Sequence, residues 1–288
     1  MASDAASASA DAGTAQSPRR AGIVLTALIL GAIVANLNLS VANVALPDIG
    51  KSLDASQTEL NLIAIGCTLG LAMSVLYLGA LGDRYGRKLM LMLGLALTLP
   101  ASAISAWAPD GAILIGGRIF TGVAAGLAYP TTLALITALW GPGKARVKAI
   151  ALWSGIGSGG AVLGPVIAGA LLEWFWWGSV FLIAVPPAIV AFVLVWKFVP
   201  AHVNESTDPV DNLGGILSIV MIAALVLGLS TIAAPGQLLP SLLMMALSLV
   251  VGVAFILRQK RVSNPIYDLH YAGRRIFWVA AVSGMIVF

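Results

Sequence analysis

Eight long apolar runs divide this 288-residue chain and constrain its fold more than any other feature. A helix needs about 20 apolar residues to cross the roughly 30 Å hydrocarbon core of a membrane. Hydrophobic residues make up 59% of the chain and charged residues only 10%, far fewer than in soluble domains. The sequence therefore predicts an all-α membrane protein with spans at 21–46, 58–81, 89–108, 112–139, 150–172, 178–199, 213–233 and 240–257.

The basic residues predict the orientation, because cytoplasmic turns carry an excess of Lys and Arg. With the N-terminus in the cytoplasm, Lys51 alone falls on the outer side and Arg118 falls within a span. The other fourteen fall on the inner side: Arg19, Arg20, Arg84, Arg87, Lys88, Lys144, Arg146, Lys148, Lys197, Arg258, Lys260, Arg261, Arg274 and Arg275. We therefore expect a multi-pass protein of the cell membrane with a cytoplasmic N-terminus. These charges lie in short turns and not on one soluble face, which argues for the lipid bilayer and against nucleic acid as a partner.

The composition also predicts how the chain is divided. Residues 1–20 are rich in Ala, Ser and Asp and are expected to form a disordered cytoplasmic tail. Residues 21–200 hold six spans, and residues 201–275 hold two further helices with cytoplasmic loops. A ninth apolar run occupies only residues 276–288, which is too short to cross a membrane. We therefore expect a C-terminal half of the same protein to complete the structure.

Four charges crowd the turn between the second and third runs, Gly79-Ala-Leu-Gly-Asp-Arg-Tyr-Gly-Arg-Lys88. This stretch resembles the loop between the second and third spans of major facilitator superfamily transporters. The resemblance implies the major facilitator fold, here one six-helix half, two linker helices and the start of a ninth helix. It also implies a conformational latch between the two halves, formed by Gly79, Asp83, Arg84, Gly86, Arg87 and Lys88. The alternative is a solvated turn that only sets the topology.

Polar side chains interrupt the first run at Asn36, Asn38, Ser40 and Asn43. A buried amide in lipid needs a partner across a helix interface or a polar cavity. We therefore take Asn36, Asn38 and Ser40 as cavity candidates. The stretch from residue 37 to residue 47 resembles the first-span motif of the fourteen-span drug/proton antiporter branch. That motif usually has an aspartate where this chain has Asn38, and an asparagine cannot titrate.

Arg118 is the only charged residue well inside a run. A charge there costs at least a few kcal/mol unless the side chain faces a partner or a cavity, or snorkels to the headgroups. The stretch Arg118-Ile-Phe-Thr-Gly-x3-Gly126 resembles the fourth-span motif of the superfamily, whose arginine is associated with the central cavity and proton transfer. We expect Arg118 to contact substrate or to modulate the cavity electrostatically, with Tyr129 and Trp153 as secondary cavity candidates.

The fifth run contains Gly160-x3-Gly164-Pro165-x2-Ala168-Gly169. It resembles the motif that marks exporters in this superfamily, although Ala168 replaces the first glycine of the usual pair. The resemblance assigns Gly160, Gly164, Pro165 and Gly169 to an antiporter-type helix. Small residues four apart also allow tight helix packing with no further role, so that alternative stays open.

No nucleophile–base pair and no metal-ligand spacing appears, so we expect neither an enzyme nor a cofactor or metal site. The favoured function is a secondary active transporter that exports drugs or other small amphipathic molecules in exchange for protons. No Asp or Glu lies well inside the eight runs, so a proton carrier must be at a helix end (Asp83, Glu59, Glu173) or beyond residue 288. Uptake or facilitated transport of a small metabolite, or a sensor or scaffold without flux, are the alternatives.

A chain limited to residues 1–288 would hold only half of the expected cavity, so it should not transport by itself. Efflux of a fluorescent drug from cells that express only these residues would contradict this prediction.

Overall fold

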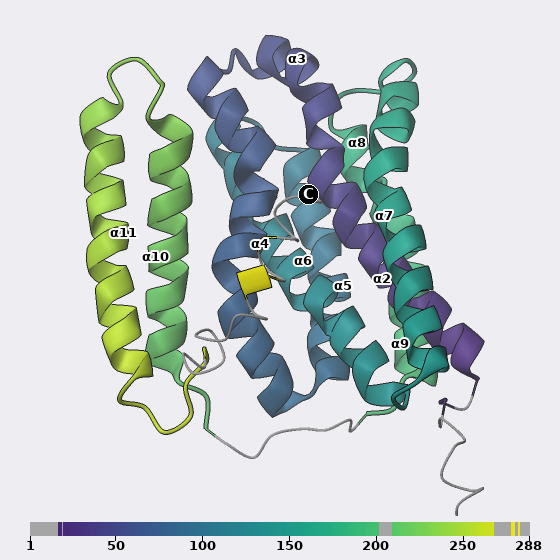
Figure 1. The fold of residues 1–288 in the computed structure, drawn as a ribbon. Helices are drawn as coiled ribbons and strands as arrows, with labels where there is room; N and C mark the ends of the chain where they lie inside the picture. Colours follow the sequence, from purple (N-terminus) through teal and green to yellow (C-terminus); the bar gives the residue numbers. More distant parts are fainter. Residues whose placement is uncertain (1–16, 19, 202–208, 268–277, 280–281, 283–288) are drawn as a thin grey trace, which may run out of the picture.

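The computed structural model describes residues 17–18, 20–201, 209–267, 278–279 and 282. Within this part of the chain the regular structure is helical, and the long helices run side by side along one axis (Figure 1). Eight helical segments are long and apolar enough to cross a membrane, which confirms the expected all-α membrane fold. The helices are α2 (Ala21–Ser40), α3 (Ala42–Leu53), α4 (Gln57–Tyr85), α5 (Arg87–Ala106), α6 (Gly111–Leu139), α7 (Lys144–Leu172), α8 (Ser179–Leu182), α9 (Val185–Phe198), α10 (Asn212–Thr231) and α11 (Leu238–Gln259).

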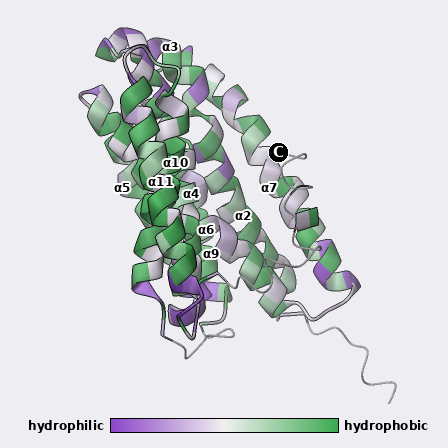
Figure 2. Ribbon diagram, turned by 60° about the vertical axis from the view of Figure 1, so that its left-hand side comes forward, coloured by the Kyte–Doolittle hydropathy of each residue, from purple (hydrophilic) through white to green (hydrophobic). Residues whose placement is uncertain are grey.

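Hydropathy is sorted along the helix axes, as Figure 2 shows: apolar residues fill the middle of the helices and many hydrophilic residues gather toward the two ends. We call the end that carries residues 79–88 the loop end. One buried core lies toward this end, around Leu28, Leu91 and Leu135. A second core surrounds Ile63 and Phe181. The expected tail at 1–20 and the ninth helix at 276–288 fall almost entirely outside the described residues.

The first span differs from the prediction of one helix over 21–46. Helix α2 ends at Ser40, a turn at Val41 follows, and α3 continues to Leu53. The Ser40 hydroxyl donates to the carbonyls of Asn36 and Leu37, and such bonds compete with the main-chain ladder and bend helices. The break therefore follows from local side-chain bonding that the apolar pattern does not reveal.

Three other spans also depart from the predicted bounds. Helix α4 runs to Tyr85, four residues beyond the predicted end at residue 81. The sixth is divided into α8 and α9, because Pro186 and Pro187 lack the N–H groups that a continuous helix requires and instead start α9. Helix α7 begins at Lys144, six residues before the predicted start, so its basic residues belong to the helix and not to a loop. Arg146 from this first part donates from Nε to the carbonyl of Trp140, the residue that caps the end of α6, at 2.7 Å.

Helix α6 is the centre of the bundle and packs against α4, α5 and α2. In α6, 61% of the most apolar 18-residue window is buried, whereas in α7 only 22% of the corresponding window is buried. It crosses α4 at backbone contact: a Cβ atom added to Gly70 would overlap the Ile119 carbonyl, and one added to Gly122 would overlap the Cys67 carbonyl. The crossing is thus possible only where both helices carry glycine.

Helices α10 and α11 form an antiparallel pair beside the six-span bundle (Figure 1), and we call residues 212–259 the linker hairpin. Helix α10 packs on α4, and α11 packs on α10. Their bounds agree within two residues with the predicted spans at 213–233 and 240–257.

Replacing Gly122 with Val should destabilise the protein strongly, because overpacking alone costs about 1–3 kcal/mol and here the added atoms meet backbone. Gly116→Val is the matched control, since an added Cβ at that position of the same helix meets nothing. The measurement is the melting temperature in detergent, followed by size-exclusion chromatography. Equal melting temperatures for the two variants would contradict the close contact between α4 and α6.

Candidate functional site

Arg118 is completely buried between α2, α4 and α6. Its Nη2 donates to the main-chain carbonyl of Asn38 at 2.9 Å, and its Nε donates to the carbonyl of Ile63 at 3.4 Å. The ring of Phe181 lies 5.3 Å from the centre of the guanidinium, within range of a cation–π interaction. A side chain with no exposed surface does not reach the headgroups, so snorkelling is excluded.

The partners of Arg118 are carbonyls and not carboxylates. Asn38 lies in the last turn of α2, where carbonyls lack helical partners and the helix dipole is negative. Among the described residues no acidic group forms an ion pair with this guanidinium, and its Nη1 has no hydrogen-bond partner. The site therefore keeps a net positive charge in the interior, held by dipoles and one aromatic ring.

The other polar residues of the first span face α7. Asn36 donates from Nδ2 to the Gly157 carbonyl at 3.1 Å, across the interface between α2 and α7. Gly160 lies against the main chain at Ile33, and Gly164 lies against the Ser40 hydroxyl. Asn36 and Ser40 are half-buried, so the structure places these two cavity candidates in a helix–helix interface. Asn38 is buried and brings its carbonyl to Arg118.

The glycines of α7 divide between two faces. Gly157, Gly160 and Gly164 meet α2, whereas a Cβ added to Gly169 would meet nothing within 4 Å. The face away from α2 exposes apolar side chains. Val162 is 70% exposed, and Val166, which follows Pro165, is 66% exposed. The predicted exporter-type helix thus packs on one side and stays open on the other.

Tyr129 and Trp153 form an aromatic pair between α6 and α7. Their ring centres lie 5.4 Å apart, and the indole Nε1 of Trp153 donates to the Thr132 hydroxyl at 2.9 Å. Tyr129 is half-buried and Trp153 is 7% exposed. Eleven residues of α6 separate Tyr129 from Arg118, which is about 16 Å along the helix, so the two features are distinct.

The charged loop, as we call residues 79–88, is more helical than predicted: residues 79–85 belong to α4 and residues 87–88 to α5, so Gly86 alone forms the turn. It contacts two further helices. Gly86 has φ 103°, a conformation that favours glycine, and its position both ends α4 and begins α5. Asp83 and Arg87 form an ion pair at 2.9 Å, and Arg87 also donates to the Ala134 carbonyl of α6 at 3.4 Å. Lys88 donates from Nζ to two carbonyls at the end of α9, at 2.9 and 2.7 Å. The loop therefore braces α4 and α5 against α6 and α9.

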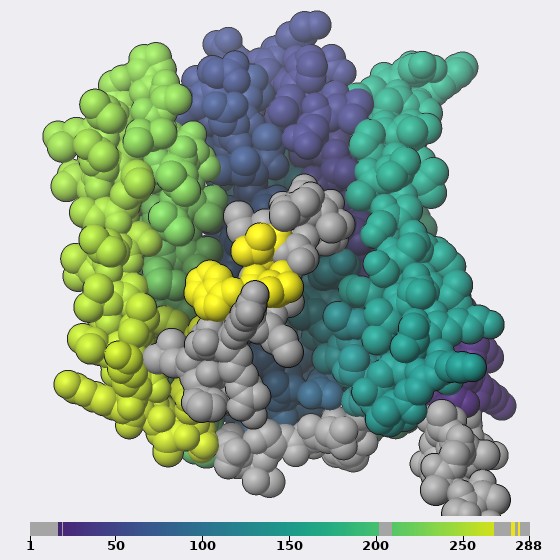
Figure 3. All heavy atoms as spheres, viewed as in Figure 1, coloured from purple at the N-terminus to yellow at the C-terminus, as the bar shows by residue number. Residues whose placement is uncertain are grey.

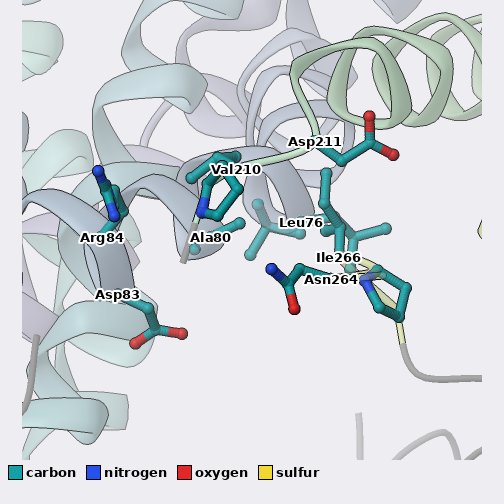
Figure 4. Close-up of a pocket in the computed structure, with 12 residues that line it drawn as sticks. Leu76, Ala80, Asp83, Arg84, Val210, Asp211, Asn264 and Ile266 are labelled. Atoms are coloured by element: carbon teal, nitrogen blue, oxygen red, sulfur yellow. The ribbon is translucent and has the colours of Figure 1, made fainter. Parts of the chain in front are cut away.

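A cleft of about 530 Å³ lies beside this loop. One wall is the end of α4, with Gly79, Asp83 and Arg84, and the other consists of residues 209–211 and 264–266. Figure 4 shows Asp83 and Arg84 on one side, with Asn264 and Ile266 on the other. An added Cβ at Gly79 would meet nothing, so the cleft leaves that position of the loop open.

A family model described as Major Facilitator Superfamily matches residues 28–288. The chain belongs to this superfamily of transporters. It is 34% identical over 256 residues to a multidrug efflux pump of Mycolicibacterium smegmatis, a match that covers 89% of this chain and 51% of the relative. It is 36% identical over 270 residues to a methyl viologen resistance protein of Salmonella typhimurium, covering 92% of this chain and 54% of the relative. The chain thus spans about half the length of these curated relatives.

Solved superfamily members share the fold at low sequence identity. A D-xylose–proton symporter superimposes with a TM-score of 0.53 at 15% identity, over 82% of this chain and 80% of that one. A peptide transporter superimposes with a TM-score of 0.61 at 14% identity, over 86% of this chain and 55% of that one. At these identities the likeness establishes the helical architecture of this multi-span membrane protein.

Several contacts of the site were not visible in the sequence. The carbonyl partners of Arg118 leave no signal in a sequence, and neither does the approach of Phe181. Gly66 could have been recognised from the sequence, because it lies four residues before Gly70, the spacing of small residues in packed helices. A Cβ added to Gly66 would lie 2.8 Å from the Cβ of Arg118. Among the described residues, no group of three His, Cys, Asp or Glu side chains is placed to hold a metal ion.

Arg118→Met should leave the melting temperature unchanged or raise it, because a buried charge without an ion-pair partner carries a desolvation cost that an apolar side chain of similar volume does not. Lys148→Met, which removes an exposed charge, serves as the control. A fall of several degrees in Arg118→Met alone would mean that the carbonyl bonds hold the fold together, against our view that the charge is retained for function.

Proposed function

We propose that this chain is part of a secondary active transporter that exports small amphipathic molecules in exchange for protons. Export would proceed by alternating access, in which two halves rock around a midplane site. The observation that carries the proposal is the superfamily match together with efflux and resistance proteins among the relatives. A methylenomycin A resistance protein of Bacillus subtilis, 32% identical over 244 residues, adds a third compound class. The match covers 84% of this chain and 52% of that relative.

The proposed orientation places the loop end in the cytoplasm, together with the N-terminus. The support is the distribution of Lys and Arg, fourteen of which fall on that side when the eight spans are threaded in order. In this orientation the exposed aromatic residues Trp107, Trp174 and Trp176 lie at the outer interface, where Trp is enriched.

The charged loop is proposed as the conformational latch on the cytoplasmic side. The Asp83 side chain is 57% exposed beside the open cleft, so it is accessible to a partner outside the six-span bundle. Arg87 holds the carboxylate in place, while Gly79 and Gly86 allow close approach and the tight turn. Lys88 serves a different purpose in this proposal, because its bonds to α9 make it a brace and not a latch residue.

Arg118 is proposed to set the electrostatic potential of the transport pathway. Its Nη1 is buried without a hydrogen-bond partner, so in this proposal a change of state opens it to an anionic or carbonyl group in the pathway. Asn36, Asn38, Ser40, Tyr129 and Trp153 remain candidates for substrate contact; of these, the aromatic pair suits flat apolar rings best.

Proton coupling needs a titratable group, and the described spans place their acids only at helix ends. Asp83, Glu59 and Glu173 are such acids, and a second half of the transporter, consistent with the length of the relatives, is the other source. The same observation favours a second candidate function, facilitated transport of a small metabolite without proton coupling.

Transport by the intact protein in inverted membrane vesicles separates the two functions. Export coupled to protons predicts uphill accumulation of methyl viologen or ethidium when the vesicle interior is acidic, and loss of accumulation when an ionophore collapses the gradient. Downhill equilibration that the ionophore does not change would support facilitated transport instead.

Asp83→Asn should preserve dependence on the proton gradient while changing the maximal rate by a fewfold, because an exposed ion pair contributes roughly 0.2–1 kcal/mol to the balance between states. Asp110→Asn, which alters the capping side chain at the start of α6, is the control. If Asp83→Asn abolishes gradient dependence, Asp83 is the proton carrier and its assignment as a latch is wrong.

A further inference from the structure

The linker hairpin meets the six-span bundle at a joint built around Tyr77 of α4. The Tyr77 hydroxyl donates to Oδ1 of Asn212 at 3.0 Å. One helical turn further along α10, a Cβ added to Gly215 would overlap the Tyr77 ring. Residues 212 and 215 are three apart and so lie on the same face of α10. One side chain of α4 is therefore held both by a hydrogen bond and by close fit.

The ends of the hairpin are clamped together by Asp211. Its buried carboxylate accepts hydrogen bonds from the Gly214 N–H at 3.0 Å and from Nε2 of Gln259 at 3.2 Å, and it forms an ion pair with Arg258 at 2.7 Å. Gln259 in turn accepts a bond from the Tyr267 N–H at 3.1 Å. This clamp fixes the start of α10, the end of α11 and the segment that follows. Removing either charged partner would leave the other poorly compensated.

Further bonds make the hairpin rigid along its length. The Ser248 hydroxyl donates to the Met221 carbonyl at 2.8 Å, and the Thr231 and Ser241 hydroxyls lie 2.8 Å apart. Gly228 allows α10 to approach the Ser241 carbonyl. Between two apolar helices these polar groups have no water to compete for them. A flexible connector, by contrast, is rich in Gly, Ser or charge and buries little.

From these contacts we propose that the linker hairpin is a fixed part of the six-span unit and moves with it as one body when the transporter changes state. The joint at Tyr77 and Gly215 carries the docking, and the Asp211 clamp carries the hairpin's own shape. The second wall of the cleft, residues 209–211 and 264–266, then travels with the charged loop. This inference goes beyond the proposed function, because it holds whatever the cargo and the coupling ion are.

Distances between two spin labels on the intact protein in nanodiscs test the proposal. Cys67→Ala removes the one cysteine of residues 1–288, any cysteine elsewhere in the intact protein is replaced as well, and labels are placed at Leu93→Cys on α5 and Val250→Cys on α11, both exposed. The two conditions are mildly acidic and mildly alkaline pH. The pKa of Asp211 stays below its ordinary value, because bonds from Arg258, Gly214 and Gln259 outweigh the opposing effect of burial, so the clamp is ionised in both. We expect one narrow distance distribution with the same mean in each condition.

Gly215→Leu drives a side chain into the Tyr77 ring and should broaden the distribution. Adding Tyr77→Ala to this variant makes room for the new side chain and should narrow the distribution again. Gly155→Leu on α7 is the matched control, since an added Cβ there meets nothing. If Gly215→Leu yields no folded protein, Tyr77→Ala alone should broaden the distribution.

Two results would overturn the proposal. One is a difference between the two pH conditions, either in the mean label-to-label distance or as a second distance population, when the joint carries no substitution. The other is an unchanged distribution in Gly215→Leu, or in Tyr77→Ala where that variant is the one that folds.

Discussion

The crossing of α4 and α6 at Gly70 and Gly122 is the contact on which the rest of the structure depends. It brings the two backbones together, and with them Arg118, one turn before Gly122 on α6. Because α4 is fixed there, its far end carries the charged loop to the ends of α6 and α9, and its outer face receives α10 at Tyr77. The positions of the buried charge, the charged loop and the hairpin thus all depend on this one helix pair.

Three basic side chains of the described residues bind carbonyls near helix ends. Arg118 takes the Asn38 carbonyl in the last turn of α2, Arg146 takes the carbonyl that caps α6, and Lys88 takes two carbonyls at the end of α9. These carbonyls are unpaired within their helices and carry the negative end of the dipole. A carbonyl does not titrate, so such contacts persist when the pH changes.

Hydropathy predicted the spans closely, because a bilayer imposes length and apolar content on every helix that crosses it. The break at Val41 escaped prediction, since it depends on hydroxyl and guanidinium bonds to main-chain carbonyls and not on apolar periodicity. The polar residues of the first span were visible in the sequence. The partner of Asn36 in α7 was not, because the Gly157 carbonyl belongs to the backbone and has no signature in the sequence. Arg118 could be identified because a charge inside an apolar run is conspicuous. The residues around it could not be predicted from the sequence.

The position of the hairpin also bears on how two extra helices can coexist with rocking halves. Helices inserted between two moving bodies resist the motion if they bind both, and leave it free if they bind only one. Tyr77 and Asp83 lie six residues apart on α4, about 9 Å along the axis, so the docking joint and the latch share one rigid helix. In Figure 3 the hairpin and α7 lie on opposite sides of the molecule. Docking on α4 therefore leaves the exposed face of α7 uncovered by the hairpin, as the proposed movement of a second half against α7 requires.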